Sequence, residues 1–181
     1  MRKYLLAIAF TLVSITGVRE NLIKLISKSQ SIDEYSSVMD IIEKEGLKKY
    51  IPLGLPLKEK HRISSEFGYR TDPFTKQKSF HSGLDFSADV AAIIYATADG
   101  KITYCGKKGG YGKLIEIEHE MGYRTRYGHL IEYYKEKGEM VKRGTPIGFV
   151  GSTGRSTGNH LHYEIIKNNQ RINPIKYINM N

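Results

Sequence analysis

Cysteine is nearly absent from the sequence, because Cys105 is the only one among 181 residues. A single thiol forms no intrachain disulfide, so the folded chain has to be stabilised by the packing of its core. It also excludes zinc sites that are built from several cysteines. We interpret Cys105 as a small core residue of a strand that includes residues 102–104.

Long hydrophobic runs are also absent, apart from one short run at the N-terminus. Residues 4–18 are almost all apolar and follow a charged start at residues 1–3, but a bilayer is comfortably spanned by roughly 20 residues. Residues 1–18 are therefore predicted to be a secretory signal peptide, although the match to an A-x-A cleavage site is poor. The alternative is a short membrane anchor at residues 4–18 that is not cleaved. Both interpretations predict an exported protein, in the periplasm, in the cell envelope or secreted.

Nucleic-acid-binding motifs are missing, although the chain is basic, with a net charge of +9 and a pI of about 9.5. The lysines are spread along the sequence, and their densest clusters, Lys58–Arg62 and Lys107–Lys108, are short. We therefore predict a solvated basic surface and no nucleic-acid partner. Basic exported proteins meet anionic surfaces such as cell-wall polymers and membranes.

The region before the glycine-rich part of the chain is predicted to be helical over residues 20–47. Its apolar residues recur near the 3.6-residue period of a helix, and Ser31 with Glu34 three positions later is a helix start signal. Gly46 is the expected C-terminal stop. A linker punctuated by proline and glycine follows, so we interpret residues 19–57 as a helical stalk with its linker.

From about residue 63 the pattern changes to short strands separated by glycines at turn-like intervals. Residues 114–118 alternate apolar and acidic side chains, as a half-buried strand does. Residues 123–127 and 147–150 are two further runs of this kind. Many short strands with glycine turns predict a mainly β domain with an antiparallel sheet core, which we place at residues 58–181.

His81 and Asp85 form an H-x-x-x-D pair. On a straight strand these residues would lie about 13 Å apart, which is too far for both to bind one metal ion. They converge only if the segment is helical or bends locally. Ser82 and Gly83 supply such a bend, because glycine relaxes the backbone.

His160 and His162 form an H-x-H pair on either side of Leu161, ahead of a predicted strand. Residues two apart on a strand share a face, so both imidazoles point the same way and Leu161 points into the core. One ring is then free to bind a metal and the other to act on water or substrate. Taken alone, the pair also fits two surface histidines, and the alternation does not say which ring holds the metal.

His129 stands alone after Tyr127-Gly128, at the end of a predicted strand. By itself it reads as a polar residue at a strand terminus. Imidazole and carboxylate are, however, the ligands that zinc prefers without sulfur, and three protein ligands with an open position are typical of catalytic zinc. The H-E-x-x-H motif is absent, so acid–base chemistry would fall to histidine. The Gly/Ser/Thr loop at residues 151–159, before His160, lacks the Gly-Lys-Ser/Thr ending of a phosphate-binding loop, so we do not interpret it as one.

These motifs, taken together, resemble the lysostaphin/LytM-type zinc metallopeptidases. In chain order they are FGYRTDP at 67–73, His81-x-x-x-Asp85, GGYG at 109–112, YGHL at 127–130 and GSTGRSTGNHLHYE at 151–164. The resemblance runs from about residue 62 to about residue 174 and keeps the order and spacing of the motifs. It does not cover the N-terminal third of the chain.

The resemblance implies a peptidoglycan endopeptidase with one Zn²⁺ ion and a substrate groove formed by long loops. His81, Asp85 and His162 match the zinc ligands of the family. His129 and His160 match the catalytic pair that orients the water and stabilises the tetrahedral intermediate. The expected substrate is a peptide of bacterial cell-wall peptidoglycan, either a stem-peptide cross-link or a cross-bridge.

A second hypothesis is a catalytically weak wall-binding or regulatory module that activates another cell-wall hydrolase. The five intact key positions argue against this hypothesis. A third hypothesis, that the zinc site is structural, is weak because structural zinc sites usually have four ligands, often cysteine. Glu164 either supports the metal site from behind or faces solvent. His61 and His119 match no motif, and we interpret both as surface residues.

Overall fold

The structure is a computed structural model that describes residues 15–180. Most of the predicted leader at residues 1–18 lies outside the described residues. Within residues 15–180, no helix combines the length and apolar character needed to cross a membrane. The chain divides into two compact units, one up to Lys48 and one from Lys49 onward.

The first unit is helical, as predicted, but it is not one continuous helix. Its elements are α2 (Ile15–Lys28), two 3-10 turns (Ile32–Glu34 and Ser36–Val38) and α3 (Met39–Lys44), and a further 3-10 turn follows at Lys48–Tyr50. The helical conformation is interrupted at Ser31, which is extended. The Ser31 amide donates a hydrogen bond to the Glu34 carboxylate at 3.1 Å.

The predicted stop at Gly46 is confirmed. Gly46 has a φ of +67°, a left-handed conformation that glycine adopts without steric cost. The Gly46 amide donates to the Glu43 carbonyl and the Leu47 amide to the Ile42 carbonyl, both at 2.9 Å. This pair of hydrogen bonds is a Schellman motif, which satisfies the last carbonyls of α3.

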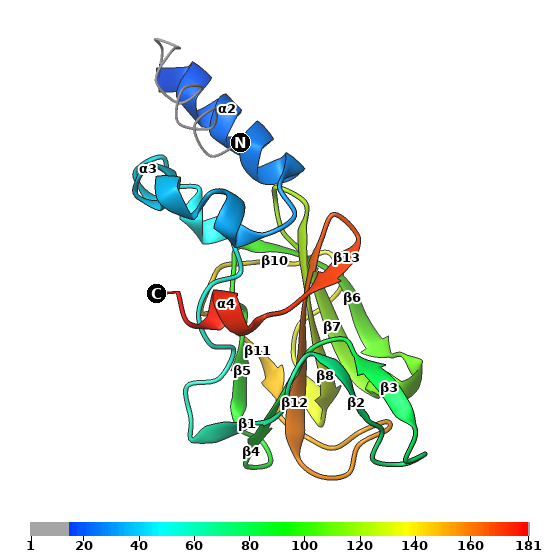
Figure 1. Cartoon of the computed structure of the whole chain (residues 1–181). Coiled ribbons are helices and arrows are strands. Elements are labelled where there is room, and N and C mark those ends of the chain that lie inside the picture. The colour runs from blue at the N-terminus through cyan, green and yellow to red at the C-terminus, as the bar shows by residue number, and fades with distance from the viewer. Residues whose placement is uncertain (1–14, 181) are drawn as a thin grey trace. The chain divides into compact units, whose positions relative to one another are not determined.

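The second unit is built on antiparallel sheets (Figure 1), as predicted. The main sheet has the strand order β1 (His61–Ser65), β4 (Leu84–Ala88), β12 (His160–Lys167), β8 (Tyr123–Leu130), β7 (Lys113–Glu118), β6 (Gly100–Lys107) and β10 (Met140–Val141), and β13 (Gln170–Ile172) also pairs with β12. A smaller sheet contains β5 (Ile93–Tyr95), β11 (Pro146–Phe149) and β9 (Glu132–Tyr133). A hairpin of β2 (Gly68–Thr71) and β3 (Lys78–His81), a 3-10 turn (Gly109–Tyr111) and α4 (Ile175–Ile178) complete the unit.

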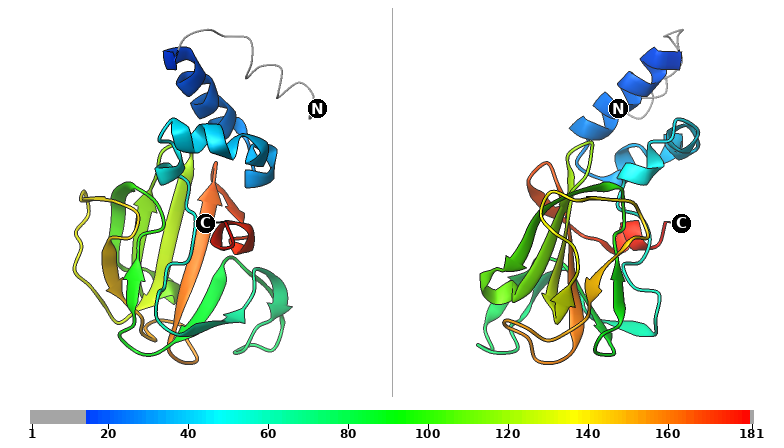
Figure 2. Two further views of the ribbon diagram at one scale, coloured as in Figure 1. Left: turned by 90° about the vertical axis from the view of Figure 1, so that its left-hand side faces the viewer. Right: turned by 180° about the vertical axis from the view of Figure 1, so that it is seen from behind.

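β12 is a central strand of the main sheet, whose ribbon is seen from two further sides in Figure 2, and one face of this strand contributes to the core. Leu161, Tyr163 and Ile165 are fully buried, as the period-2 alternation of a strand requires. The buried Tyr163 hydroxyl lies 2.8 Å from Thr97 Oγ1, so its polar atom is satisfied. The other face of β12 is therefore free to carry polar side chains.

Two details differ from the sequence-based expectations. Cys105 does lie in a strand, β6, but it is only half-buried and is not a core residue. The compact unit begins ahead of the predicted domain start at residue 58, because Ile51 and Leu53 are buried and Leu57 forms a β-bridge with Ile94.

Candidate active site

The site is assembled across three neighbouring strands, with β12 between β4 and β8. His162 on β12 lies opposite Asp85 of β4 on one side and opposite Gly128 of β8 on the other. His129 follows Gly128, and His160 lies two residues before His162 on the same strand. The register of the sheet therefore gathers residues that are up to 77 positions apart in the sequence.

His81 joins this group through the turn at Ser82-Gly83, between β3 and β4. The predicted bend is present, and Gly83 is required there for close packing. A Cβ atom at Gly83 would lie 2.3 Å from the Tyr163 carbonyl oxygen and 3.0 Å from Cε1 of His162. The turn thus packs directly against β12, which brings His81 next to His162.

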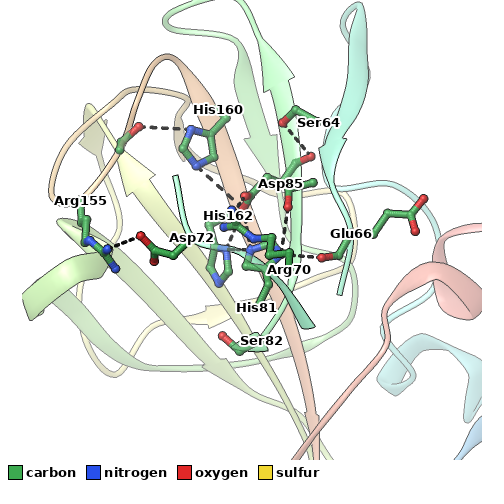
Figure 3. A network of polar contacts seen from close by, with 12 residues as sticks. Ser64, Glu66, Arg70, Asp72, His81, Ser82, Asp85, Arg155, His160 and His162 are labelled. Carbon is green, nitrogen blue, oxygen red and sulfur yellow. Dashed lines mark hydrogen bonds and ion pairs between the residues drawn. The ribbon is translucent and has the colours of Figure 1, made fainter. Parts of the chain in front are cut away.

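Three side chains converge on one point (Figure 3). Asp85 Oδ1 lies 3.1 Å from His81 Nε2 and 2.8 Å from His162 Nδ1, and these two ring nitrogens lie 3.1 Å apart. All three side chains are buried. Among the described residues, His81, Asp85 and His162 are the cluster whose donor atoms lie close enough together to hold one metal ion.

The opposite nitrogen of each of these imidazoles has a fixed partner. His81 Nδ1 donates to the Glu66 carbonyl at 2.7 Å, and His162 Nε2 donates to Glu164 Oε1 at 3.2 Å. Outer partners of this kind set the tautomer of a metal-binding histidine and the orientation of its ring. They direct His81 Nε2 and His162 Nδ1 at the point where Asp85 Oδ1 also lies.

Asp85 and His162 stabilise each other's charged forms. Burial alone would raise the pKa of Asp85, but hydrogen bonds from His162 and His81 outweigh it and hold that pKa well below its usual range. Burial alone would lower the pKa of His162, but Asp85 and Glu164 reverse the effect and raise it to about 9. A group of donors that attracts a proton this strongly also attracts a cation.

Glu164 does not face solvent, because it is fully buried behind His162. Besides His162 it accepts hydrogen bonds from Ser82 Oγ, from the Tyr111 hydroxyl at 2.7 Å and from Arg126 at 3.3 Å. Burial alone would raise the pKa of Glu164, but His162, Ser82 and Tyr111 lower it to about 2. Of the two sequence-based interpretations, the supporting carboxylate is therefore the one that the structure shows.

His129 and His160 form a second group beside the first, with ring centroids 4.6 Å apart. His129 Nδ1 donates to the Thr153 carbonyl and His160 Nδ1 to the Gly158 carbonyl, both at 2.8 Å. Both acceptors belong to the loop at residues 151–159, so this loop holds both rings with Nε2 available. His160 Nε2 lies 3.8 Å from Asp85 Oδ1, farther out than the three converging atoms.

His129 has two further signs of a specialised position. Its φ of +63° is unusual for a residue with a Cβ atom and costs on the order of 1 kcal/mol or more, which surrounding contacts have to offset. Burial, with smaller contributions from His160 and His162, lowers its pKa to about 4, although the Thr153 carbonyl opposes this. His129 is therefore neutral at pH 7 and able to accept a proton.

A groove of about 450 Å³ opens over these side chains, which confirms the expected groove formed by loops. His81, Asp85, His129, His160 and His162 all line it. Its walls come from the hairpin β2–β3 with its connecting turn and from the loop at residues 151–159. A substrate that enters the groove can thus reach both groups of side chains.

The interpretation of His119 as a surface residue is wrong. The ring is 5% exposed, with Nδ1 2.8 Å from the Asp99 carbonyl and Nε2 2.8 Å from Thr125 Oγ1. Its burial follows from the tight packing of β7 and β6 at Gly100, where an added Cβ would lie 2.6 Å from the His119 ring. It lies outside the groove, and His61, which is half-exposed on β1, also lies outside it.

Sequence reasoning assigned no role to several groove residues. Arg70 lies 3.7 Å from the second carboxylate oxygen of Asp85, and Arg155 forms an ion pair with Asp72 at 2.6 Å. Tyr111 reaches the buried Glu164. The groove residues Arg70, Tyr111 and Arg155 stand inside the motifs that carried the family resemblance, as does Asp72, the partner of Arg155. The motifs alone did not show which side chains face the groove.

Comparisons with known proteins agree with this geometry. The DD-carboxypeptidase/endopeptidase Mpg of Neisseria meningitidis serogroup B is 49% identical over 114 residues, which are 63% of this chain and 26% of that protein. The peptidoglycan DD-endopeptidase ShyB of Vibrio cholerae is 39% identical over 116 residues, which are 64% of this chain and 27% of that protein. The matched part of this chain thus spans about a quarter of the length of these relatives.

A solved structure shows the same fold. The catalytic domain of the antimicrobial peptidase lysostaphin from Staphylococcus simulans superposes with a TM-score of 0.60 and 29% identity, covering 65% of this chain and 92% of that domain. The model of Peptidase family M23 matches residues 79–174, which include all five predicted site residues. The match extends over just over half of the 181 residues, and the chain therefore belongs to peptidase family M23.

Proposed function

We propose that the chain is a zinc-dependent endopeptidase that hydrolyses peptide bonds of cell-wall peptidoglycan. The observation that carries the proposal is the convergence of His81 Nε2, Asp85 Oδ1 and His162 Nδ1 within about one hydrogen-bond length of one another. The relatives described above, a DD-carboxypeptidase/endopeptidase and a peptidoglycan DD-endopeptidase, support the substrate class.

The residues present fit a zinc ion. Two imidazole lone pairs that face each other at 3.1 Å repel unless a cation or proton lies between them, and two histidines with one carboxylate are a donor set of catalytic zinc. We therefore assign His81, Asp85 and His162 as the ligands. When bound, zinc acts as a Lewis acid and lowers the pKa of water at its open position.

We assign the proton transfers to His129 and His160. His129 is neutral at pH 7, so its Nε2 can take the proton from the attacking water. His160 offers Nε2 on the same side of the groove, and when that nitrogen carries a proton it can donate to the oxyanion that develops on the scissile carbonyl. The proton taken by His129 can then pass to the leaving amine. The two Nδ1–H groups stay on the Thr153 and Gly158 carbonyls, which keeps each ring oriented while its proton content changes.

The remaining parts of the chain follow from this activity. A peptidoglycan substrate requires action outside the cytoplasm, and residues 1–18 are proposed to direct export as a signal peptide or anchor. Residues 19–57 are proposed as a stalk and linker, and residues 58–181 as the peptidase domain. The alternative of a regulatory module is not favoured, because the groove retains both histidines needed for proton transfer.

The proposal is tested with purified, zinc-loaded protein and isolated sacculi of several cross-link types. We expect soluble muropeptides whose masses identify the bond that is cut, and we expect a chelator to stop the reaction until zinc is added back. His162→Ala is expected to be inactive, whereas His61→Ala, a histidine outside the groove, is expected to be active. If the zinc-loaded protein leaves all of these sacculi intact, the proposed activity is wrong.

A further inference from the structure

The charged side chains that line the groove are not balanced. Apart from the histidines, they are Arg70, Arg155 and Asp85, and Asp85 is assigned above to the metal. A groove that combines two guanidinium groups with a divalent cation has a positive field, and such a field favours anionic substrates. The net charge of +9 on the whole chain acts in the same direction.

The two arginines are engaged differently. The Arg70 guanidinium lies 3.7 Å from Asp85 Oδ2, the carboxylate oxygen that is not part of the converging trio, so its charge is directed at a metal ligand. Arg155 makes no contact with a proposed ligand. Its side chain is 48% exposed, so it is accessible to a molecule in the groove.

Arg155 is held in one place from three directions. Its NH2 group donates to Asp72 Oδ1 at 2.6 Å, its guanidinium lies over the Phe74 ring at 4.6 Å, and its backbone amide donates to the Gly110 carbonyl at 2.9 Å. Asp72 is itself fixed, because the same oxygen accepts the amides of Phe74 and Thr75, both at 2.9 Å. Figure 3 shows Arg155 and Asp72 together beside the histidine group.

This arrangement leaves donors available. A guanidinium carries five N–H groups in a planar fork, and among the described residues the side chain of Arg155 has a hydrogen-bond acceptor only for NH2. A guanidinium that is already immobilised loses little conformational entropy when it binds a second oxyanion. The planar fork matches the two oxygens of a carboxylate.

We propose that Arg155 is a specificity-determining residue that binds a free carboxylate of the substrate, on a residue next to the scissile bond. This inference rests on the proposed endopeptidase function and narrows its substrate class. Stem-peptide cross-links that carry free carboxylates are the preferred substrates. Cross-bridges made only of neutral residues, and stem peptides in which that carboxylate is amidated, are poor ones.

The test uses two synthetic cross-linked stem-peptide dimers that differ only in carboxylate or carboxamide beside the scissile bond. We expect the zinc-loaded full chain to cleave the carboxylate peptide with a kcat/KM roughly 10- to 100-fold higher, as for one hydrogen-bonded ion pair. In Arg155→Gln this ratio is expected to approach one, and in Arg155→Lys to be intermediate, because the charge stays but the fork is lost. Arg62→Gln, an exposed arginine outside the groove, is the matched control and should keep the wild-type ratio.

Binding of the same two peptides, measured by calorimetry on the chain with and without zinc, provides a readout that does not need turnover. Preferential binding of the carboxylate peptide that disappears in Arg155→Gln supports the inference even if neither peptide is cleaved, in which case the proposed activity alone fails. Cleavage or binding of both peptides with equal efficiency by the wild type overturns the inference. Retention of the preference in Arg155→Gln overturns it as well.

Discussion

His162, in β12, and His119, directly after β7, are both deeply buried histidines, yet their electrostatic environments are opposite. Burial lowers the pKa of His119 to about 4, although the Asp99 carbonyl opposes this effect. At His162 the same burial is outweighed by the carboxylates of Asp85 and Glu164, and the pKa rises to about 9. Burial of an imidazole therefore says little about function, whereas the charge of its two partners separates a site residue from a structural one.

The largest expected difference between the two histidines is in metal content. His162→Ala removes one of three converging donors, so zinc measured in the purified protein should fall from about one equivalent to background, and wall hydrolysis should stop. His119→Gln keeps a side chain that can donate and accept hydrogen bonds, and it should retain both zinc and activity. Equal loss of zinc in the two variants would contradict the contrast drawn between them.

His129 extends the comparison to a buried histidine outside the metal trio. His129→Ala is expected to reduce kcat by roughly 10²- to 10⁴-fold, the usual contribution of a general acid or base. Its zinc content should match that of the wild type, since His129 is not one of the three proposed ligands. A variant that loses zinc together with activity would place His129 among the ligands instead.

The contribution of His119 to stability can be separated from other contributions by its dependence on pH. Because the folded state holds this imidazole neutral down to about pH 4, the unfolded chain binds the additional proton between pH 6.5 and 4. His119 therefore destabilises the fold as the pH decreases through that window, by roughly 3 kcal/mol in total. Urea unfolding of the wild type and of His119→Gln at several pH values should show the difference between them shrink or reverse on acidification. A difference that is constant with pH would rule out this explanation.

The smallest effect is expected for the carboxylate behind His162. Glu164→Gln keeps the shape of the side chain but removes its charge, so zinc affinity measured by competition with a chelator should fall roughly 10- to 100-fold. Glu118→Gln, on the exposed end of β7, is the matched control and should leave the affinity unchanged. Full zinc affinity in Glu164→Gln would mean that hydrogen bonding alone, without charge, orients His162.

The sequence was sufficient for the features that depend on local geometry. The period of a strand places His160 and His162 on one face, and Ser82-Gly83 provides the turn without which His81 and Asp85 remain too far apart. The division of these residues into ligands and catalytic residues came from the family resemblance. Contacts across the sheet were not predictable, because nothing near Glu164 in the sequence indicates that Ser82, Tyr111 and Arg126 surround it.

The error at His119 has a similar cause. Glu118 and Glu120 flank it, so the local sequence reads as polar and exposed, whereas its burial depends on the distant Asp99 carbonyl and on Thr125 of the neighbouring strand. The start signal at Ser31 was recognised, but the 3-10 turns that follow it were not predicted, because a capping signal does not distinguish a 3-10 turn from an α-helix.

The placement of three polar residues at alternate positions of β12 limits how this chain can change length. An insertion in the loop at residues 151–159 alters the rim of the groove but leaves the strand register intact. A single inserted residue between His162 and Glu164 would turn Glu164 and every later residue of β12 to the opposite face. Natural variation in length should therefore fall outside β12, while the spacing from His160 to Glu164 stays constant.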